Sequence, residues 1–411
     1  MNRTFAYLYI ITMTISFTTR YADFRFGTNF IQLLIGLIWV SIAVVNYLLT
    51  QKNSVRKKDT VWLIKSYLIP QIIIHCYTVI LILCGFLSSN AFSTNITIYI
   101  PILVAISSIY LFGINSFKYT FYALIMSWTL SVFSSILYKG PGIIIYAIIQ
   151  AYIDTFTSFG GYTTNYFELH DVVLAIGYVI CFYIFDKIRL TKKNFFIILS
   201  AMLIMTMGMK RIAILAIVIC FIFHKLVNLF SDKKQYKLCL IAGGLITSGA
   251  YIFIWILNQG SEFFSYMLRF GSDFLMGRNY YWTAVLGKIS FSPSFLGLGR
   301  NSLTKLFNSE FSYMNVSGVH SDILKMYAEN GFILFGIWLI YYMLIMTKKY
   351  RKYLGIKAAL CYFTISIYTF ILYFTDNTEV YYICIIFSII IPFCYAIRQR
   401  NEFIYKYKKN N

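Results

Sequence analysis

Long apolar segments recur along the whole chain, and short polar intervals separate most of them. Many approach the roughly 20 residues that an α-helix needs to cross a hydrocarbon core of about 30 Å. Strand-like alternation of apolar and polar residues between turn signals is missing. We therefore expect an all-α integral membrane protein, a polytopic bundle of about 12 transmembrane helices. They are expected over residues 4–18, 31–49, 61–86, 96–114, 119–137, 171–186, 194–209, 211–229, 236–257, 331–346, 358–374 and 380–397.

Two of the intervals between these segments are long. Residues 138–170 contain an apolar stretch, 143–153, which is too short to span and lies between Pro-Gly and Gly-Gly breaks. An interfacial or re-entrant helix fits that pattern. Residues 258–330 form the only long polar interval. We interpret 1–411 as a single polytopic membrane domain, in which 258–330 is a large external loop.

Composition and charge set the protein class and the topology. The chain is 59% hydrophobic and 12% charged, with a mean hydropathy of +0.69, which excludes an ordinary soluble domain. With both termini in the cytoplasm, roughly 24 basic residues lie inside and about 11 outside. The net charge of +21 is then mainly the positive-inside signal and attraction to anionic lipid. It does not indicate a nucleic-acid partner.

The cysteines offer no metal chemistry. All eight fall within or against the apolar segments, and no CxxC spacing occurs. We therefore expect neither disulfides nor a thiolate metal site. The first apolar stretch has no small-residue cleavage motif and is interpreted as a retained span.

Basic residues gather in the large loop, although the positive-inside rule does not place them there. An arginine there offers a planar, permanently charged donor fork that suits two phosphate oxygens at once. This clustering predicts that the loop binds an anionic ligand. The residues concerned are Arg269, Arg278, Lys288, Arg300, Lys305, His320 and Lys325.

Two polar motifs outside that loop have alternative interpretations. Lys210 and Arg211 open the span 211–229 from the external side, where they either snorkel to lipid headgroups or face a catalytic cavity. His170 and Asp171, with Glu168 before them, stand where the span 171–186 begins. They are either part of a helix N-cap or part of the external site.

Within the loop, Arg278 is followed by Tyr280, Tyr281 and Trp282, whose rings could stack on sugars or exclude water. Further along, a Gly297-x-Gly299 turn before Arg300 would let the backbone approach a ligand closely.

His320 is the sharpest candidate for proton transfer near neutral pH. At helical spacing His320, Leu324 and Tyr327 share one face. Asp322, Lys325 and Glu329 share another face, on which i+3 and i+4 charge pairing is expected.

The order of these motifs resembles the O-antigen polymerase (Wzy-type) and O-antigen ligase superfamily of bacterial envelope polysaccharide synthesis. The resemblance covers residues 160–350 by motif and the whole chain by topology. Its motifs are Lys210-Arg211 opening a span, Gly277-Arg278 before Trp282, Pro293 before Gly297-x-Gly299, and His320 followed by Glu329-Asn330-Gly331. The family commonly has Asn directly after the histidine, where this chain has Ser321, and that departure counts against the ligase.

The resemblance implies a glycosyltransferase of lipopolysaccharide or related polysaccharide biosynthesis in the bacterial inner membrane, with its site facing the periplasm. It would join oligosaccharide repeat units carried on undecaprenyl pyrophosphate, with no cofactor and no metal. Other implied partners are membrane lipids, a chain-length regulator and a flippase. The resemblance makes Arg211, Arg278 and His320 catalytic.

Matching that chemistry to the remaining residues assigns them to substrate. Lys210, Arg269 and Arg300 would hold the second pyrophosphate, and Tyr281 and Trp282 would contact sugars. Glu329 is a second candidate base.

Two other functions stay open. An O-antigen ligase would use the same site but transfer a finished chain to a core sugar of lipid A. A flippase for lipid-linked repeat units is a transporter, which should place charges in a central cavity along the spans and keep its loops short.

Overall fold

The computed structural model describes residues 3–18, 29–50, 54–88, 98–157, 170–185, 192–207, 210–259, 278–311, 318–376 and 378–410. Throughout these residues the regular structure is helical, as expected. The helices are α1 (Arg3–Phe17), α2 (Asn29–Leu49), α3 (Val55–Leu63), η1 (Ile64–Leu68), α4 (Ile69–Leu83), α5 (Tyr99–Phe112), α6 (Asn115–Lys139), α7 (Pro141–Thr157), α8 (His170–Phe185), α9 (Lys192–Met207), α10 (Arg211–Val227), α11 (Asp232–Asn258), α13 (Arg278–Leu286), α14 (Ser302–Asn308), α15 (Asp322–Ile340), η5 (Tyr341–Ile345), α16 (Met346–Leu354), α17 (Ile356–Thr375), η6 (Thr378–Val380) and α18 (Tyr382–Asn410).

A helix occupies each of the twelve predicted segments. Seven helices of the described chain are long and apolar enough to cross a membrane, and they are Phe30–Leu49, Val55–Leu83, Asn115–Lys139, Asp232–Asn258, Asp322–Leu354, Ile356–Thr375 and Tyr382–Arg400. The remaining five, α1, α5, α8, α9 and α10, have only 14 to 17 residues. The helical membrane protein is therefore confirmed, while the number of twelve spans and the position of the termini stay predictions.

The bundle is built around its last two spans. Within the apolar window of α18, 78% of residues are buried, and in α17 the share is 67%. In α2 and α11 it is 22%, and the exposed residues there are apolar, which suits helices that face lipid. The helices α5, α8 and α17 surround α18, and α10 packs along α17.

The contact between α8 and α17 is close at Gly177. The Tyr368 hydroxyl of α17 donates a 2.9 Å hydrogen bond to the main-chain oxygen of Leu174 in α8. To do so it crosses Gly177, where a Cβ would lie 1.9 Å from that hydroxyl oxygen. Small residues commonly allow such approaches between membrane helices.

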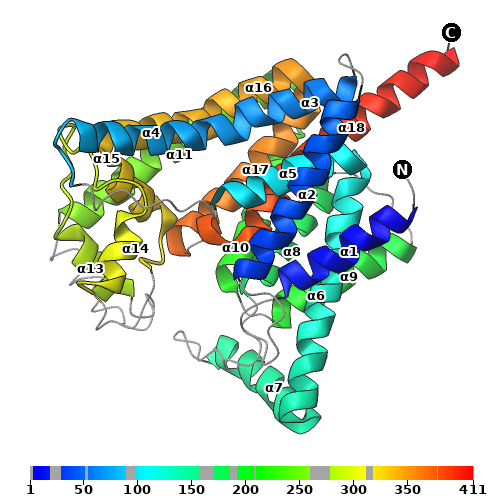
Figure 1. Cartoon of the computed structure of the whole chain (residues 1–411), viewed down its shortest axis with the longest axis horizontal. Coiled ribbons are helices and arrows are strands. Elements are labelled where there is room, and N and C mark those ends of the chain that lie inside the picture. The colour runs from blue at the N-terminus through cyan, green and yellow to red at the C-terminus, as the bar shows by residue number, and fades with distance from the viewer. Residues whose placement is uncertain are drawn as a thin grey trace.

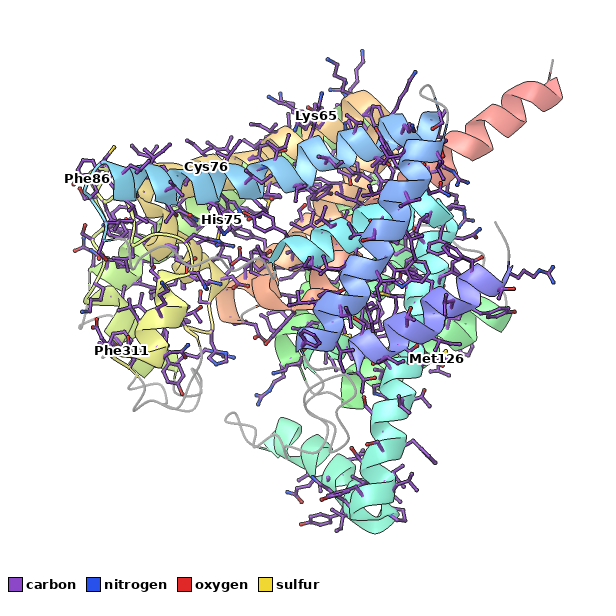
Figure 2. The ribbon with its side chains drawn as sticks, in the orientation of Figure 1. Lys65, His75, Cys76, Phe86, Met126 and Phe311 are labelled. Carbon is purple, nitrogen blue, oxygen red and sulfur yellow. The ribbon has the colours of Figure 1, made fainter. Side chains whose placement is uncertain are left out.

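The two ends of the bundle carry different chemistry (Figure 1). At the end formed by α3 and α16, the buried carboxylate of Asp59 accepts from Arg400 at 3.0 and 3.3 Å and from the Tyr353 hydroxyl at 2.8 Å. Arg351 lies over the Tyr236 ring at 4.0 Å. The opposite end holds α13 and α14, next to the far ends of α4 and α15. Figure 2 shows Phe86 and Phe311 at this second end.

Candidate functional site

Two glycine motifs cross backbone to backbone at the end of the bundle that holds α13 and α14. Gly297 has a φ of 95° and Gly331 a φ of 74°. A Cβ on Gly331 would lie 2.3 Å from the carbonyl carbon of Leu296, and one on Gly297 would lie 2.5 Å from the Gly331 nitrogen. Only glycine fits either position.

Three main-chain hydrogen bonds hold this crossing together. They run from Leu298 N–H to the Ala328 oxygen at 2.8 Å, from Gly299 N–H to the Glu329 oxygen at 2.9 Å, and from Phe332 N–H to the Phe295 oxygen at 2.9 Å. The crossing breaks α15 at Gly331, so residues 322–330 form a separate helical segment. The first residue after the Gly297-x-Gly299 turn, Arg300, is thereby brought against this segment.

Arg300 lies at the centre of a buried ion cluster. Its Nη1 is 3.3 Å from Oε2 of Glu329, and its Nη2 pairs with Oε1 of Glu379. Nζ of Lys325 is 3.3 Å from Oε2 of Glu379. Asp322 accepts from the Glu379 N–H at 2.7 Å and from the Thr378 hydroxyl at 3.2 Å. The cluster therefore ties the large loop and α15 to the connection between α17 and α18.

The charges of this cluster compensate one another. Burial acts to raise the pKa of Glu379, but Arg300 and Lys325 outweigh it and lower that pKa to about 2. Burial acts to lower the pKa of Arg300, but Glu379 and Glu329 outweigh it and raise that pKa. Two cations thus face the carboxylates of Asp322, Glu329 and Glu379, all of them buried. A cluster with no excess of positive charge is a poor receptor for another anion.

Burial in this ion cluster distinguishes Arg300 and Glu329 from the other predicted site residues. The exposed fraction of Arg300 is 4% and that of Glu329 is 0%, and each is the other's partner. A buried charge that loses its partner destabilises a protein strongly. We conclude that both residues shape the site by holding its walls together.

A second group of predicted residues gathers around α13. Trp282 is buried, and its Nε1–H donates to the Val319 oxygen at 3.0 Å. Its ring packs edge-on against Phe253 at 5.8 Å, and Phe253 in turn packs against Phe374 of α17 at 5.1 Å. Trp282 therefore anchors α13 to α11 and to the segment just before α15, and its buried ring offers no open platform for a sugar.

Tyr281 and His320 lie side by side, with ring centroids 6.0 Å apart, and both are half-buried. The expectation that His320 shares a helix face with Leu324 and Tyr327 is wrong. Helix α15 begins at Asp322, Ser321 is its N-cap with Oγ accepting from the Leu324 N–H at 3.3 Å, and His320 precedes it at a φ of 50°. Ser321 can play this part because serine and asparagine are both good N-caps.

The predicted charge pairing along that helix also differs from the structure. The ion pair of Lys325 is formed with Glu379, and that of Glu329 with Arg300. The partners come from other elements because the segment is buried, where long-range partners are within reach.

Arg278 is the first residue of α13 and is half-buried. A cation at a helix N-terminus is unfavourable, because that end of the helix dipole is positive. Burial lowers the pKa of Arg278, and the nearby Asp376, Tyr381 and Tyr281 act in the opposite direction. An arginine still keeps its charge at neutral pH. The position is therefore one where an anion would be strongly stabilised.

Lys210 and Arg211 lie at the N-terminus of α10, with Lys210 as the N-cap residue. Helix α10 runs antiparallel to α17, because Cys220 Sγ contacts the Thr364 oxygen at 3.5 Å and Phe223 packs on Phe363 at 5.5 Å. Nine residues back from Cys220, Arg211 is level with Tyr373, near the C-terminal end of α17. Arg211 and Arg278 thus belong to the same end of the bundle.

Three further predicted residues complete the comparison. Asp171 lies in the first turn of α8, and its main-chain oxygen accepts from Cys384 Sγ at 3.7 Å. That contact places it at the end of the bundle that holds Asp376. Arg269 and Glu168 lie outside the described residues.

Sequence reasoning missed the connection between α17 and α18. It supplies Glu379 to the ion cluster, and Asp376 and Tyr381 to the surroundings of Arg278. A signal was present, since Asp376 and Glu379 lie in one short polar interval of a chain with only 15 acidic residues.

A cavity of about 110 Å³ lies beneath the ion cluster, inside the bundle. It is bounded by α4, α5, α15, η5, α17 and α18, mainly by apolar side chains, and Glu379 and Gln71 are among its polar walls. Among the described residues no group of three His, Cys, Asp or Glu side chains is arranged to hold a metal ion.

No protein-family model matches this chain, and no curated protein matches it. Its family therefore stays a proposal.

Proposed function

We propose that this protein is a polysaccharide polymerase of the bacterial inner membrane, which joins undecaprenyl-pyrophosphate-linked repeat units into O-antigen or a related surface polysaccharide. The observation that carries the proposal is the position of Arg278. It is a half-buried cation at the N-terminus of α13, three residues before Tyr281, whose ring centroid lies 6.0 Å from that of His320. The reaction must stabilise an anionic leaving group and remove a proton from the acceptor hydroxyl. Arg278 suits the first task, and His320 suits the second.

The end of the bundle that holds Arg278 suits a periplasmic reaction. Basic side chains cluster at the opposite end, in α3 and α16. The positive-inside rule assigns that opposite end to the cytoplasm. Arg278 and His320 then face the periplasm, where the lipid-linked units are joined.

The chemistry assigns a task to each group. The bond between the donor sugar and its diphosphate breaks, and the acceptor hydroxyl forms the new glycosidic bond. The leaving diphosphate gains negative charge in the transition state, where Arg278 and Arg211 stabilise it. His320 accepts the proton of the acceptor hydroxyl. Lys210 and Arg269 hold the second diphosphate, and Tyr281 contacts the sugar.

The test uses purified protein in nanodiscs with lipid-linked repeat units. Wild type is expected to produce a ladder of longer glycans on a gel. Arg278→Ala should lower the rate by about 10²–10³, the usual cost of removing one transition-state donor. Arg278→Lys should restore little, because a lysine has no planar fork.

Lys288→Ala is the matched control. It removes a positive charge from the same loop, but Lys288 pairs with Glu310 at 2.8 Å on the exposed surface. The control variant should retain the ladder. A near-normal ladder from Arg278→Ala would contradict the proposed site.

One observation favours the transporter alternative. Charged residues are buried inside the bundle next to a cavity, which is typical of transporters. However, the cavity of about 110 Å³ is smaller than the roughly 300 Å³ of the smallest usual ligand pockets, so it does not fit an oligosaccharide. A flippase would move a labelled repeat unit across a liposome without changing its mass, whereas a polymerase increases that mass. A ligase would need a lipid A core acceptor in the same assay.

A further inference from the structure

The cavity beneath the ion cluster has a wall whose polar groups offer acceptors. Four hydroxyl groups of this wall already donate to main-chain oxygens, at 2.7 to 2.9 Å. A hydroxyl has one proton and two lone pairs, so each of these groups can only accept from an occupant of the cavity. The carboxylate of Glu379, in the same wall, also accepts only. The four hydroxyl groups belong to Tyr362, Ser366, Thr369 and Ser388.

Gln71 of α4 supplies the clearest demand for an occupant. Its side chain is 7% exposed, and its Nε2 donates to the Tyr342 hydroxyl at 3.2 Å. Its Oε1 is buried and has no hydrogen-bond partner among the described residues. An unpaired buried acceptor is unfavourable, so Gln71 requires a donor on the cavity side.

The helices that carry Gln71 and Tyr342 depart from regular α-helix beside the cavity. The α3–α4 span contains the π-helical turn η1, and the neighbouring α15–α16 span contains η5 (Figure 1). The two turns lie against each other, because the Tyr341 hydroxyl of η5 donates to the Ser66 oxygen of η1 at 2.9 Å. Each turn supplies wall residues, Tyr67 from η1 and Tyr342 from η5. Single π-helical turns are frequent at functional sites, which indicates that the cavity is a built feature of the fold.

An aromatic layer lies between the cavity and the end of the bundle that holds α3 and α16. The Tyr67 hydroxyl is 2.8 Å from the Tyr350 hydroxyl. Beyond this pair, the Trp62 ring packs edge-on against Tyr350 at 5.0 Å and stacks on Tyr353 at 5.1 Å. The polar contacts of the cavity therefore lead toward the ion cluster, and the rings separate them from the buried Asp59.

We propose that the cavity holds a cluster of bound water molecules, which donate hydrogen bonds to Gln71 Oε1 and to the Glu379 carboxylate. A cavity needs roughly 10–15 Å³ to hold one water, so about 110 Å³ accommodates several. The cluster gives the Glu379 carboxylate a polar neighbour inside a mainly apolar bundle. It extends hydration from the ion cluster into the membrane domain, whichever reaction the protein catalyses.

Other occupants leave this wall unsatisfied. A lipid chain would bring no donor to Gln71, and an anion would face the Glu379 carboxylate and the acceptors around it. A cation is disfavoured, because Arg300 and Lys325 already pair with the two oxygens of Glu379. The wall therefore selects a neutral molecule with several donors, and water is the smallest that fits.

The chain contains reporter residues for this water. Met343 and Trp338 line the cavity and are 3% and 6% exposed. Radiolysis of a bound water produces hydroxyl radicals in place, and these radicals oxidise the side chains beside it. Met13 and Trp39 are matched controls, since they are 0% and 2% exposed and belong to α1 and α2, which do not bound the cavity.

The experiment irradiates full-length protein in nanodiscs with a synchrotron X-ray beam and measures the oxidation of each residue by mass spectrometry. Met343 should be oxidised severalfold faster than Met13, and Trp338 severalfold faster than Trp39. Equal rates within each pair overturn the proposal, because a dry cavity yields no local radicals. If the faster oxidation requires sodium or potassium ions and disappears in choline buffer, the occupant is a cation and the proposal is wrong.

Gln71→Leu removes the anchoring oxygen, so oxidation of both reporter residues should fall to the rates of their controls. Gln235→Leu is the control variant, because Gln235 is also buried and its Nε2 donates to the Phe230 oxygen at 2.8 Å, outside the cavity. That variant should keep the wild-type rates. A folded Gln71→Leu with wild-type rates overturns the proposal, and if Gln71→Leu does not fold, the wild-type comparison decides alone.

Discussion

Gly331→Ala tests the backbone crossing on which the site is built. The backbone of Gly331, with φ 74° and ψ 179°, lies in a region that is essentially restricted to glycine and costs another residue about 1–3 kcal/mol. The added Cβ would also lie 2.3 Å from the Leu296 carbonyl carbon, so the two backbones must separate by about 1 Å to reach ordinary contact. Three main-chain hydrogen bonds span the crossing, and each contributes about 1 kcal/mol. We expect the free energy of unfolding to fall by about 4–6 kcal/mol in total.

The assay is reversible unfolding in mixed micelles, followed by tryptophan fluorescence. Gly244→Ala in α11 is the control, since a Cβ there meets nothing within 4 Å. That variant should be neutral or more stable by up to about 1 kcal/mol, because alanine is the better helix former. A loss of less than about 1 kcal/mol in Gly331→Ala would refute the reasoning, since the backbone strain alone should cost that much.

Two other predictions concern the packing and the charges of the bundle. Gly177→Ala should destabilise the protein by about 2–3 kcal/mol, because the Tyr368 ring must move away and lose its hydrogen bond to the Leu174 oxygen. Comparing its unfolding midpoint with that of Gly244→Ala tests this. The pKa of Glu379 is lowered from 4.5 to about 2 in the folded protein, so its contribution to stability is present above pH 4.5 and is lost as the pH falls to 2. Glu379→Gln should therefore be less stable than wild type at neutral pH and should lose less stability on acidification. If its free energy of unfolding falls as steeply as that of wild type between pH 4.5 and 2, the prediction is contradicted.

The helical framework could be predicted because lipid imposes a simple rule on sequence. A membrane helix satisfies its own backbone polar groups, so length and apolar composition indicate its position. All twelve segments predicted on this basis contain a helix. The prediction over 331–346 left out the start of its helix, since α15 begins at Asp322. Asp322, Lys325 and Glu329 gave that region a polar appearance, and their burial depends on partners that are distant in sequence.

The candidate site was predictable only in part, because its contacts also join residues that are distant in sequence. Arg278, Tyr281 and His320 were chosen by residue type, and the structure brings them to one end of the bundle. The pairing of Arg300 with Glu379 joins residues 79 positions apart, and no local pattern indicates it. The conformation of His320 was also beyond reach, because it depends on Ser321 capping α15.

The crossing of two glycines also suggests how remote homologues could be recognised. The residues in the two segments that cross must evolve together, because a side chain on either glycine would displace the opposite backbone. Arg300, Glu329 and Glu379 are bound by a similar constraint, since a lone buried charge is poorly tolerated. A search profile weighted on these five positions, with their spacing, should detect relatives whose lipid-facing helices have diverged too far for overall similarity to show.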